Sequence, residues 1–309
     1  FDLLAALYRE EARHLGVTIG DREIAESILE NNLHGIDIDP RAVQIAAAAL
    51  LLKARSFASG AQPRRLNLVA PALQLGDLPP DDPATAQLCQ ELKREVGLPE
   101  ALTRTLLSAL AGVDYLGSLL KVDVVIEESL RDVELEAERT PGQGELFGGF
   151  PPLRSKSRVK VSAADATATL LSRLERFLAA HTASYDLGLQ LDGEQLATGL
   201  RFLSLVRPGT YDIVAGNPPY FGTQSLAHTE YLDRAYPLSK ENLCTVMLDR
   251  AMDLARSSGQ VAFVAIRNWL YVSQLSAFRA DVFRRFPPSC AADLGLGGFE
   301  SLPGVEVVM

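Results

Sequence analysis

Apolar residues recur at two different spacings in the first part of the chain. Segments 1–12 and 41–55 carry them every three or four positions, which predicts two amphipathic helices, and a further helix follows the turn at Gly20. Two short apolar runs, at 32–37 and 66–70, are too short for helices and are typical of strands. This part of the chain therefore predicts strands that alternate with helices.

The last third of the chain repeats the alternation. Strands are expected at 211–215, 261–266, 291–296 and 305–309, and helices at 241–255 and 273–286, with a break at 257–259 after the first of these helices. Strand–helix alternation in this order predicts an α/β fold with a doubly wound, Rossmann-like sheet.

Residues 79–206, between these two parts, follow a different pattern. Helical spacing recurs there, and a stretch rich in Gly, Pro and Glu opens a linker near 138–160 that we expect to be mobile. A helical insertion between the third and fourth strands is the simplest interpretation, so we expect three regions, 1–78, 79–206 and 207–309. The basic run in the linker is interpreted first as a solvated surface and second as a phosphate contact; it comprises Arg154, Lys156, Arg158 and Lys160.

The composition of the chain is that of an ordinary globular protein. Of its 309 residues, 47% are hydrophobic and 22% are charged, which suffices for a sizeable core in one large or two modest domains. No apolar run approaches the roughly 20 residues of a membrane span, so we expect no membrane partner. The three cysteines are scattered without metal-ligand spacing, which favours reduced thiols, no metal and a cytoplasmic protein; they are Cys89, Cys244 and Cys290.

The most distinctive segment is a buried strand that runs directly into a stiff loop. A β-rich run at 211–215 is followed by a glycine, which allows a turn without a Cβ clash, and Pro218 and Pro219 then fix two consecutive φ angles. The loop presents the Asn217 amide, the Pro218 carbonyl and the Tyr220 ring beyond the carboxyl end of the strand, where open α/β sheets bind ligands. A proline-stiffened loop with a surface tyrosine is the alternative.

These groups suit an exocyclic amine on a flat ring, such as adenine N6. The lone pair of this amine is delocalised into the ring, so the amine is a poor nucleophile. An amide oxygen and a backbone carbonyl can accept its two N–H bonds and stabilise the positive charge that grows as it attacks. An aromatic face can hold the ring, and such stacking contributes about 1–3 kcal/mol per base.

A second candidate site lies where the strand near residue 37 ends. Asp37 stands at the strand end, Asp39 is placed to cap the next helix, and Pro40 takes the first helical position. A carboxylate after such a strand binds the hydroxyls of a nucleoside ribose, so Asp37 is the candidate ligand, with Ile38 beside it. Helix capping is the alternative role for such an acid, and it fits Asp39 better than Asp37.

The tetrapeptide from Asn217 to Tyr220 resembles motif IV of the S-adenosylmethionine-dependent amino methyltransferases, most often adenine-N6 DNA methyltransferases. Together with the sequences at 33–40 and 267–270, it is similar to the large PglX-type enzymes of BREX phage-defence systems, and type IIG restriction–modification enzymes share the same core. The resemblance covers about 1–70 and 210–309. It implies a methyltransferase sheet that closes on an antiparallel pair of strands.

The resemblance also implies a binding site for S-adenosylmethionine. The element around Asp37 and Ile38 corresponds to motif II of that site, and Asp77 stands where motif III often places an acid that binds the adenine amine of the cofactor. The proline-rich surroundings of Asp77 leave an ordinary loop as the alternative. The glycine-rich motif I is expected just before Phe1, so the chain is interpreted as a segment that begins after it.

The implied reaction is direct methyl transfer to an adenine flipped out of double-stranded DNA. The adenine stacks on Tyr220, and its N6 is bound by the Asn217 side chain and the Pro218 carbonyl. Family members carry a Trp-Leu pair at 269–270, where packing is favoured over a role in the pocket wall for Trp269. The expected partners are DNA and other subunits of a defence system. The net charge of −9 then requires a local basic patch or a binding surface outside this segment.

Two other interpretations stay open. The same tetrapeptide serves enzymes that methylate glutamine side chains of release factors, and some rRNA methyltransferases, although these are usually compact and lack a long insertion. Alternatively, the chain is a non-catalytic piece that acts as a scaffold, because without motif I it would bind the cofactor poorly.

Overall fold

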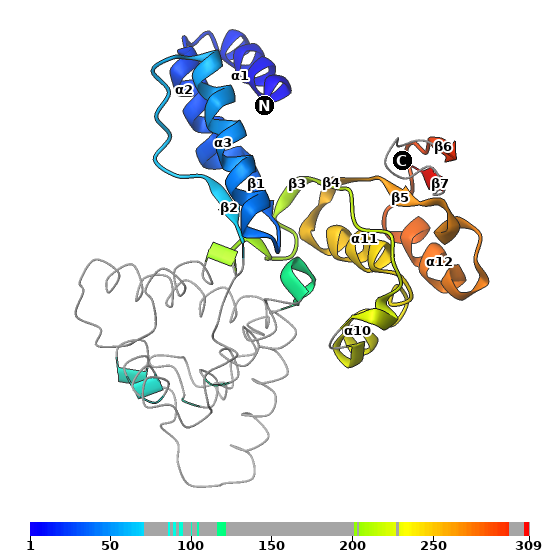
Figure 1. The fold of residues 1–309 in the computed structure, drawn as a ribbon. Coiled ribbons are helices and arrows are strands. Elements are labelled where there is room, and N and C mark those ends of the chain that lie inside the picture. The colour runs from blue at the N-terminus through cyan, green and yellow to red at the C-terminus, as the bar shows by residue number, and fades with distance from the viewer. Residues whose placement is uncertain are drawn as a thin grey trace, which may run out of the picture. The chain divides into compact units, whose positions relative to one another are not determined.

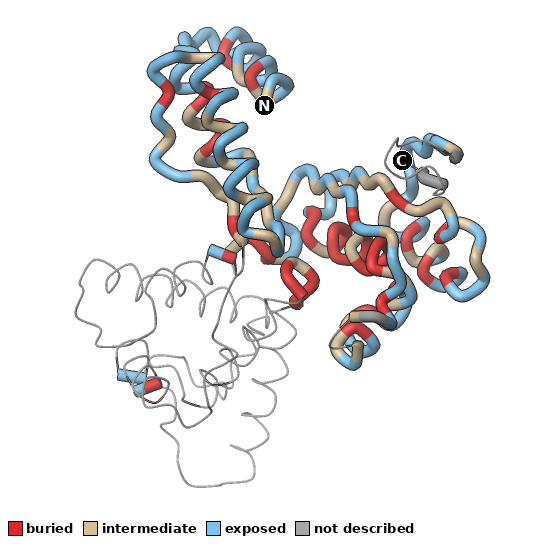
Figure 2. Tube along the Cα trace, in the orientation of Figure 1, coloured by how far each residue is buried: buried red, intermediate tan, exposed pale blue. Residues whose placement is uncertain are grey.

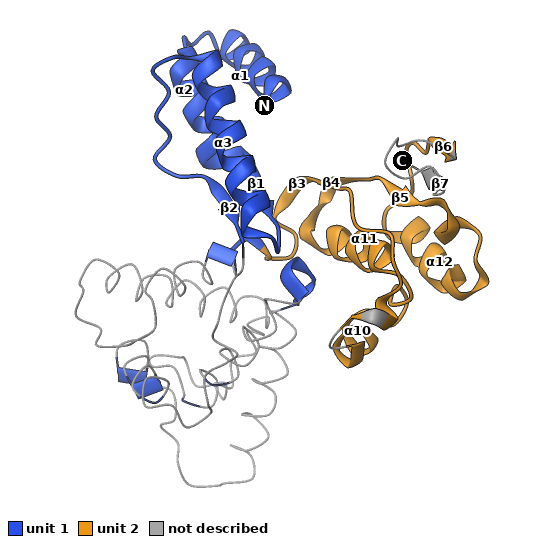
Figure 3. Cartoon of the chain, viewed as in Figure 1, with its two compact units in different colours: residues 1–205 blue, residues 206–309 orange. Residues whose placement is uncertain are grey.

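The computed structural model (Figure 1) describes residues 1–70, 116–121, 201–202, 204–226, 229–296 and 306–308, together with a few single residues between 86 and 104. The chain divides into two compact units, residues 1–205 and 206–309 (Figure 3). We call them unit 1 and unit 2 and describe each by itself. Asp77 and the linker near 138–160 lie outside the described residues.

In unit 1, a pair of N-terminal helices is followed along the chain by a strand–helix–strand motif. Its elements are α1 (Asp2–Leu15), α2 (Asp21–Ser27), the π-helical turn η1 (Ile28–Asn32), β1 (His34–Ile36), α3 (Pro40–Phe57), β2 (Asn67–Val69) and the 3-10 turn η3 (Gly117–Leu119). Strands β1 and β2 pair in parallel, with His34 opposite Asn67 and Ile36 opposite Val69. Two parallel strands joined by a helix confirm the predicted alternation at this point.

Helix α3 begins as its sequence predicts. Asp39 is the N-cap residue, its carboxylate accepts a hydrogen bond from the Arg41 backbone N–H at 2.9 Å, and Pro40 occupies the first turn. Small and aliphatic side chains pack α3 against α2, and Ala54 is the buried residue of α3. Two apolar residues of α3, Ile45 and Leu52, are exposed.

Unit 2 is built around one buried helix and two sets of strands. Its elements are β3 (Tyr211–Gly216), η4 (Thr223–Ser225), α10 (Thr229–Ala235), α11 (Leu243–Leu254), β4 (Ala255–Phe263), β5 (Ala265–Ile266), η5 (Arg267–Leu270), η6 (Ser273–Leu275), α12 (Ser276–Arg285), β6 (Asp293–Leu296) and β7 (Glu306–Val308). Strands β3 and β4 are parallel. Strand β3 was expected to be buried, but its residues are partly or fully exposed, Ile213 at 67%, because few side chains of the described residues cover it. Strand β7 pairs antiparallel with both β5 and β6, which gives the antiparallel end that the sequence predicts.

One predicted strand has different limits in the structure. The run expected at 261–266 forms two strands, because β4 already begins at Ala255 and the chain leaves β3 for a new partner, β7, after Val264. The residues at 257–259 were expected to end the preceding helix, and α11 does end before them, at Leu254. They do not form a turn, because pairing with β3 holds them extended, with an irregular register between Tyr211 and Ile213. Tertiary pairing overrides the local turn preference here.

The fold is mixed α/β with small parallel sheets, as predicted at this coarse level. The described strands pair in three separate sets: β1 with β2, β3 with β4, and β5 with β7 and β6. A continuous doubly wound sheet is not seen among them and stays a prediction. Within the residues described, no helix combines the length and the apolar character that a membrane crossing requires.

The core of unit 2 surrounds α11. Figure 2 shows this helix buried along most of its length, and nearly all of its side chains are inaccessible to water. Trp269, Phe278 and Val282 pack with Cys244, Leu248 and Met252 of the helix in one cluster. Trp269 is 8% exposed, and its ring lies edge-on to Phe278 at 5.9 Å between centroids. The packing role that was favoured for Trp269 agrees with this position.

Candidate functional site

The stiff loop follows the carboxyl end of β3, which lies next to the carboxyl end of the parallel strand β4. Gly216, the last residue of β3, pairs with Phe263, the last residue of β4. Along the loop, Asn217 is exposed, Pro218 is buried, and Tyr220 is partly buried. An exposed asparagine is therefore followed by a buried proline and a partly buried tyrosine, at the edge where α/β sheets bind ligands.

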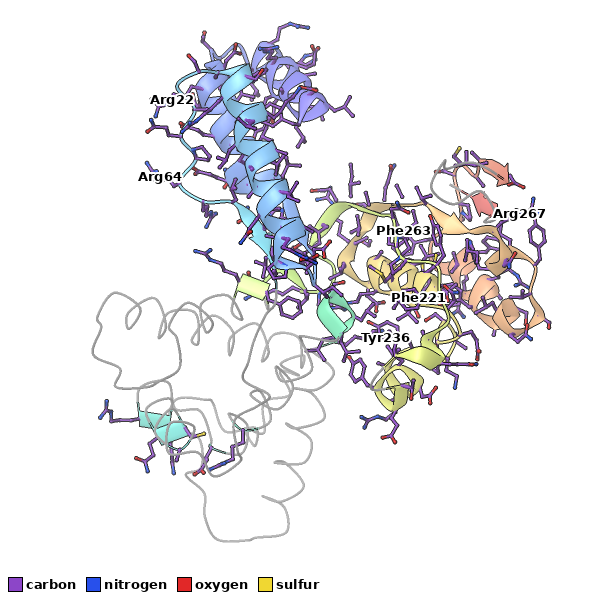
Figure 4. The ribbon with its side chains drawn as sticks, viewed as in Figure 1. Arg22, Arg64, Phe221, Tyr236, Phe263 and Arg267 are labelled. Carbon is purple, nitrogen blue, oxygen red and sulfur yellow. The ribbon has the colours of Figure 1, made fainter. Side chains whose placement is uncertain are left out.

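The start of the loop favours a glycine. A Cβ atom at Gly216 would lie 2.7 Å from Cζ of Phe263, which is closer than real Cβ contacts come. The Gly216 carbonyl also accepts a hydrogen bond from the Val264 N–H at 3.1 Å. The Phe263 ring, which Figure 4 labels together with Phe221, therefore covers the glycine and fixes where the loop departs.

Tyr220 is held at both its ring and its hydroxyl. The ring packs against the core cluster around α11. The hydroxyl lies 2.8 Å from Oδ1 of Asn217 and 3.3 Å from the carbonyl oxygen of Val264. Burial raises the pKa of the Tyr220 phenol, and the neighbouring Cys244 adds to the rise, so the hydroxyl keeps its proton at neutral pH.

The far end of the loop is tied to the start of α11. The Phe221 carbonyl accepts a hydrogen bond from the Leu243 N–H at 3.0 Å, and Gly222 forms an antiparallel bridge with Asn242. The Asn242 side chain in turn caps α11 by accepting from the Cys244 N–H at 2.9 Å. Each end of the loop is therefore fixed by a backbone contact with a residue that is distant in the sequence.

The cysteine next to Tyr220 is a buried thiol. Cys244 is buried, and burial raises the pKa of its thiol to about 11. The reactive form of a cysteine is the thiolate, and burial disfavours that form at neutral pH. Within the described ranges, no cluster of three or more His, Cys, Asp or Glu side chains is arranged to bind a metal ion.

In unit 1, the two acids after β1 have different partners. The Asp39 carboxylate caps α3 and pairs with the Arg41 guanidinium at 2.9 Å. These contacts with Arg41 lower the pKa of Asp39. Asp37 continues the strand ladder through its N–H, 3.2 Å from the Val69 carbonyl, and one of its side-chain oxygens accepts the Asp39 N–H at 2.8 Å. Asp37 is exposed. The capping role therefore falls to Asp39, as expected, while Asp37 faces solvent.

Ile38 has a neighbour that the sequence did not reveal. Its side chain is 61% exposed, and a Cβ atom at Gly117 would lie 2.8 Å from its Cγ2 atom. Gly117 has a φ of +49°, which favours glycine, and it opens the 3-10 turn η3. A lone glycine within a long insertion carries no recognisable signal, so only the structure shows that this turn packs on Ile38.

The structure thus groups the predicted site residues in two places. Asn217, Pro218, Pro219 and Tyr220 form one loop of unit 2, and Asp37 and Ile38 form the end of β1 in unit 1. Asp77 lies outside the described residues. The roles assigned to all of them stay predictions.

An Asn-Pro-Pro-Tyr loop after a parallel strand is typical of methyltransferases that act on planar amines. Residues 31–289, most of the chain, match the Eco57I restriction-modification methylase family, and the chain belongs to this family. Family membership confirms the resemblance seen in the sequence. It also implies a methyl donor and a Rossmann-like methyltransferase fold.

Two curated relatives carry names that agree with this family. The chain is 24% identical over 315 residues to the adenine-specific methyltransferase PglX of Lacticaseibacillus casei (strain Zhang), and 24% identical over 315 residues to the adenine-specific methyltransferase BrxX of Escherichia coli O9:H4 (strain HS). Both matches cover 100% of this chain but only 21% and 23% of the relatives. The chain therefore spans about a fifth of their length.

Proposed function

We propose that the protein is a DNA adenine-N6 methyltransferase. It methylates specific DNA sites as part of a BREX phage-defence or restriction–modification system. The observation that carries this proposal is the loop after β3. An exposed Asn217 amide stands beside the buried Pro218 and the partly buried Tyr220 ring. Membership of the Eco57I family and the names of the two relatives support the same activity.

The chemistry follows from these groups. The flipped adenine would stack on Tyr220, while the Asn217 side-chain oxygen and the Pro218 carbonyl accept its two N6–H bonds. Both acceptors stabilise the positive charge that develops on N6 as it attacks. Because the loop is fixed before the substrate arrives, little reorganisation is needed during the reaction. Direct transfer needs no covalent enzyme intermediate, and a buried Cys244 is consistent with this.

The methyl donor in this proposal is S-adenosylmethionine, which supplies an electrophilic methyl group on a sulfonium. The end of β1 fits part of such a molecule. Asp37 has one side-chain oxygen engaged by the Asp39 N–H, and its other oxygen can accept from the ribose hydroxyls. The exposed face of Ile38 can cover an adenine ring. Asp77 remains a further candidate for the adenine amine of the cofactor.

The proposal extends to the fold and to the partners. Family membership supports a Rossmann-like core, and we infer a doubly wound sheet with the insertion at 79–206 between its third and fourth strands. Double-stranded DNA is the proposed substrate, and other defence-system subunits are the proposed partners.

The test uses the full-length protein, labelled S-adenosylmethionine and unmethylated genomic DNA, which is then digested to nucleosides. We expect the label in N6-methyladenosine. Label in protein glutamine or in rRNA, with none in DNA, would replace the proposal by one of the other amino methyltransferase activities. Absence of label with all acceptors, added cell extract included, would favour a scaffold.

A further inference from the structure

The hydrogen-bond ladder between β3 and β4 ends at Pro218, which has no backbone N–H to continue it. The Gly216 carbonyl accepts the Val264 N–H at 3.1 Å, and Gly216 is paired with Phe263. In a parallel ladder, the next hydrogen bond of this alternation runs from the backbone nitrogen of residue 218 to the Val264 carbonyl. Proline has no N–H, so the ladder cannot supply a donor to this carbonyl.

The Tyr220 hydroxyl contacts the Val264 carbonyl in place of the missing backbone donor. It lies 3.3 Å from the Val264 carbonyl oxygen and 2.8 Å from Oδ1 of Asn217. Both of these atoms are hydrogen-bond acceptors, whereas a phenol has one proton to donate. With the amide in this orientation, one of the two contacts therefore has no proton.

Rotation of the Asn217 amide by half a turn supplies the missing proton. The two ends of an asparagine amide have nearly the same shape, and the hydrogen-bond network decides which end faces a neighbour. With Nδ2 toward Tyr220, the amide N–H donates to the phenol oxygen, and the phenol O–H donates to the Val264 carbonyl. Each contact then carries one proton, and each acceptor is used once.

We propose that the Tyr220 hydroxyl is a positioning group that orients the Asn217 amide for catalysis. The arrangement turns the side-chain oxygen of Asn217, an exposed residue, away from Tyr220 and toward the place where a substrate amine would bind. This inference rests on the proposed function of the loop, and it gives Tyr220 a second role besides stacking.

The first test compares Tyr220→Phe with Tyr271→Phe in the full-length protein. The phenylalanine at 220 keeps the aromatic face and removes only the hydroxyl, and Tyr271 is an exposed tyrosine of the same unit. We expect Tyr220→Phe to lower kcat for adenine methylation about tenfold, which corresponds to roughly one hydrogen bond. Its KM for DNA should stay within about twofold, and Tyr271→Phe should match the wild type.

The second test asks whether the hydroxyl acts through Asn217. In a double-mutant cycle with Asn217→Ala, removal of the hydroxyl should have little further effect, because the group that it orients is already absent. Multiplicative effects of the two substitutions would show that Tyr220 acts independently of Asn217 and would overturn the inference.

A third readout does not depend on activity. The side-chain amide of Asn217, assigned by its loss in Asn217→Ala, should shift in the nitrogen–proton NMR spectrum of Tyr220→Phe toward the values of free asparagine. An unchanged amide signal would overturn the inference even if activity falls. Adenine methylation by the wild type with an unaffected Tyr220→Phe variant would overturn the positioning role alone, whereas no adenine methylation by the wild type would overturn the proposed function as well.

Discussion

The two candidate sites differ in how firmly the fold holds them. In unit 2, the loop after β3 is covered by Phe263, tied to α11 at its far end, and anchored through the Tyr220 ring and hydroxyl. In unit 1, the Asp37 side chain has one contact among the described residues, a turn hydrogen bond from the Asp39 N–H, and Ile38 is largely exposed. The loop of unit 2 therefore packs against buried residues, whereas the end of β1 in unit 1 is exposed.

The helices next to these sites show the same contrast. Most residues of α11 are buried (Figure 2). In contrast, α3 buries Ala54 and exposes Ile45 and Leu52. Electrostatic stabilisation of a transition state requires groups that are fixed in advance, which fits the loop of unit 2. A ligand that is bound and released tolerates groups that are held less firmly, which fits the end of β1.

The largest expected effect is at the start of the rigid loop. Gly216→Ala places a methyl group against the Phe263 ring and should lower the free energy of unfolding by about 2 kcal/mol. Gly222→Ala is the matched control, because its Cβ would meet only the Glu241 carbonyl at 3.8 Å. Urea denaturation measures both. Equal stability of the two variants would mean that the Phe263 ring does not restrain the loop.

The next effect is on cofactor binding at the end of β1. Asp37→Asn keeps an oxygen for the Asp39 N–H but removes the charge, and it should weaken S-adenosylmethionine binding about tenfold, because hydrogen bonds to charged groups are strong. Asp39→Asn should leave the affinity unchanged, since asparagine is also a good N-cap. Isothermal titration of both variants decides. Equal affinities would remove Asp37 from the cofactor site.

A smaller effect is expected at Gly117. Gly117→Ala and Gly16→Ala both place a side chain at positive φ, but only the first has a neighbour, Ile38, within 4 Å. Both variants should lose about 1 kcal/mol of stability from backbone strain. Only Gly117→Ala should also weaken S-adenosylmethionine binding, by about threefold, because it displaces Ile38. Thermal unfolding and titration separate the two effects.

The smallest effect is a pH dependence at the start of α3. Contacts with Arg41 lower the pKa of Asp39 from its ordinary value of 3.8. The stabilisation is therefore complete above about pH 4 to 5 and is lost as the pH falls through the lowered pKa. The stability difference between the wild type and Asp39→Asn should shrink with acidification. Urea midpoints between pH 3 and 7 measure this, and a difference that grows in acid would contradict the assignment.

Local features could be predicted from the sequence, and contacts between distant residues could not. The Asp39 cap and the end of β3 at Gly216 follow from residue types at adjacent positions. The early start of β4 and its change of partner at Val264 depend on pairing with β3 and β7, which no short window of sequence contains. The contact between Tyr220 and Val264, 44 residues apart, and that between Ile38 and Gly117 were missed for the same reason.

The most direct test of the central claim is the nucleoside assay with one pair of variants. Asn217→Ala removes the proposed acceptor of the substrate amine, and Asn31→Ala removes an exposed asparagine of unit 1 that has no assigned role. The account predicts that labelled N6-methyladenosine falls about 100-fold or more in the first variant and stays at the wild-type level in the second. Adenine methylation that survives Asn217→Ala would show that the loop after β3 is not the catalytic site.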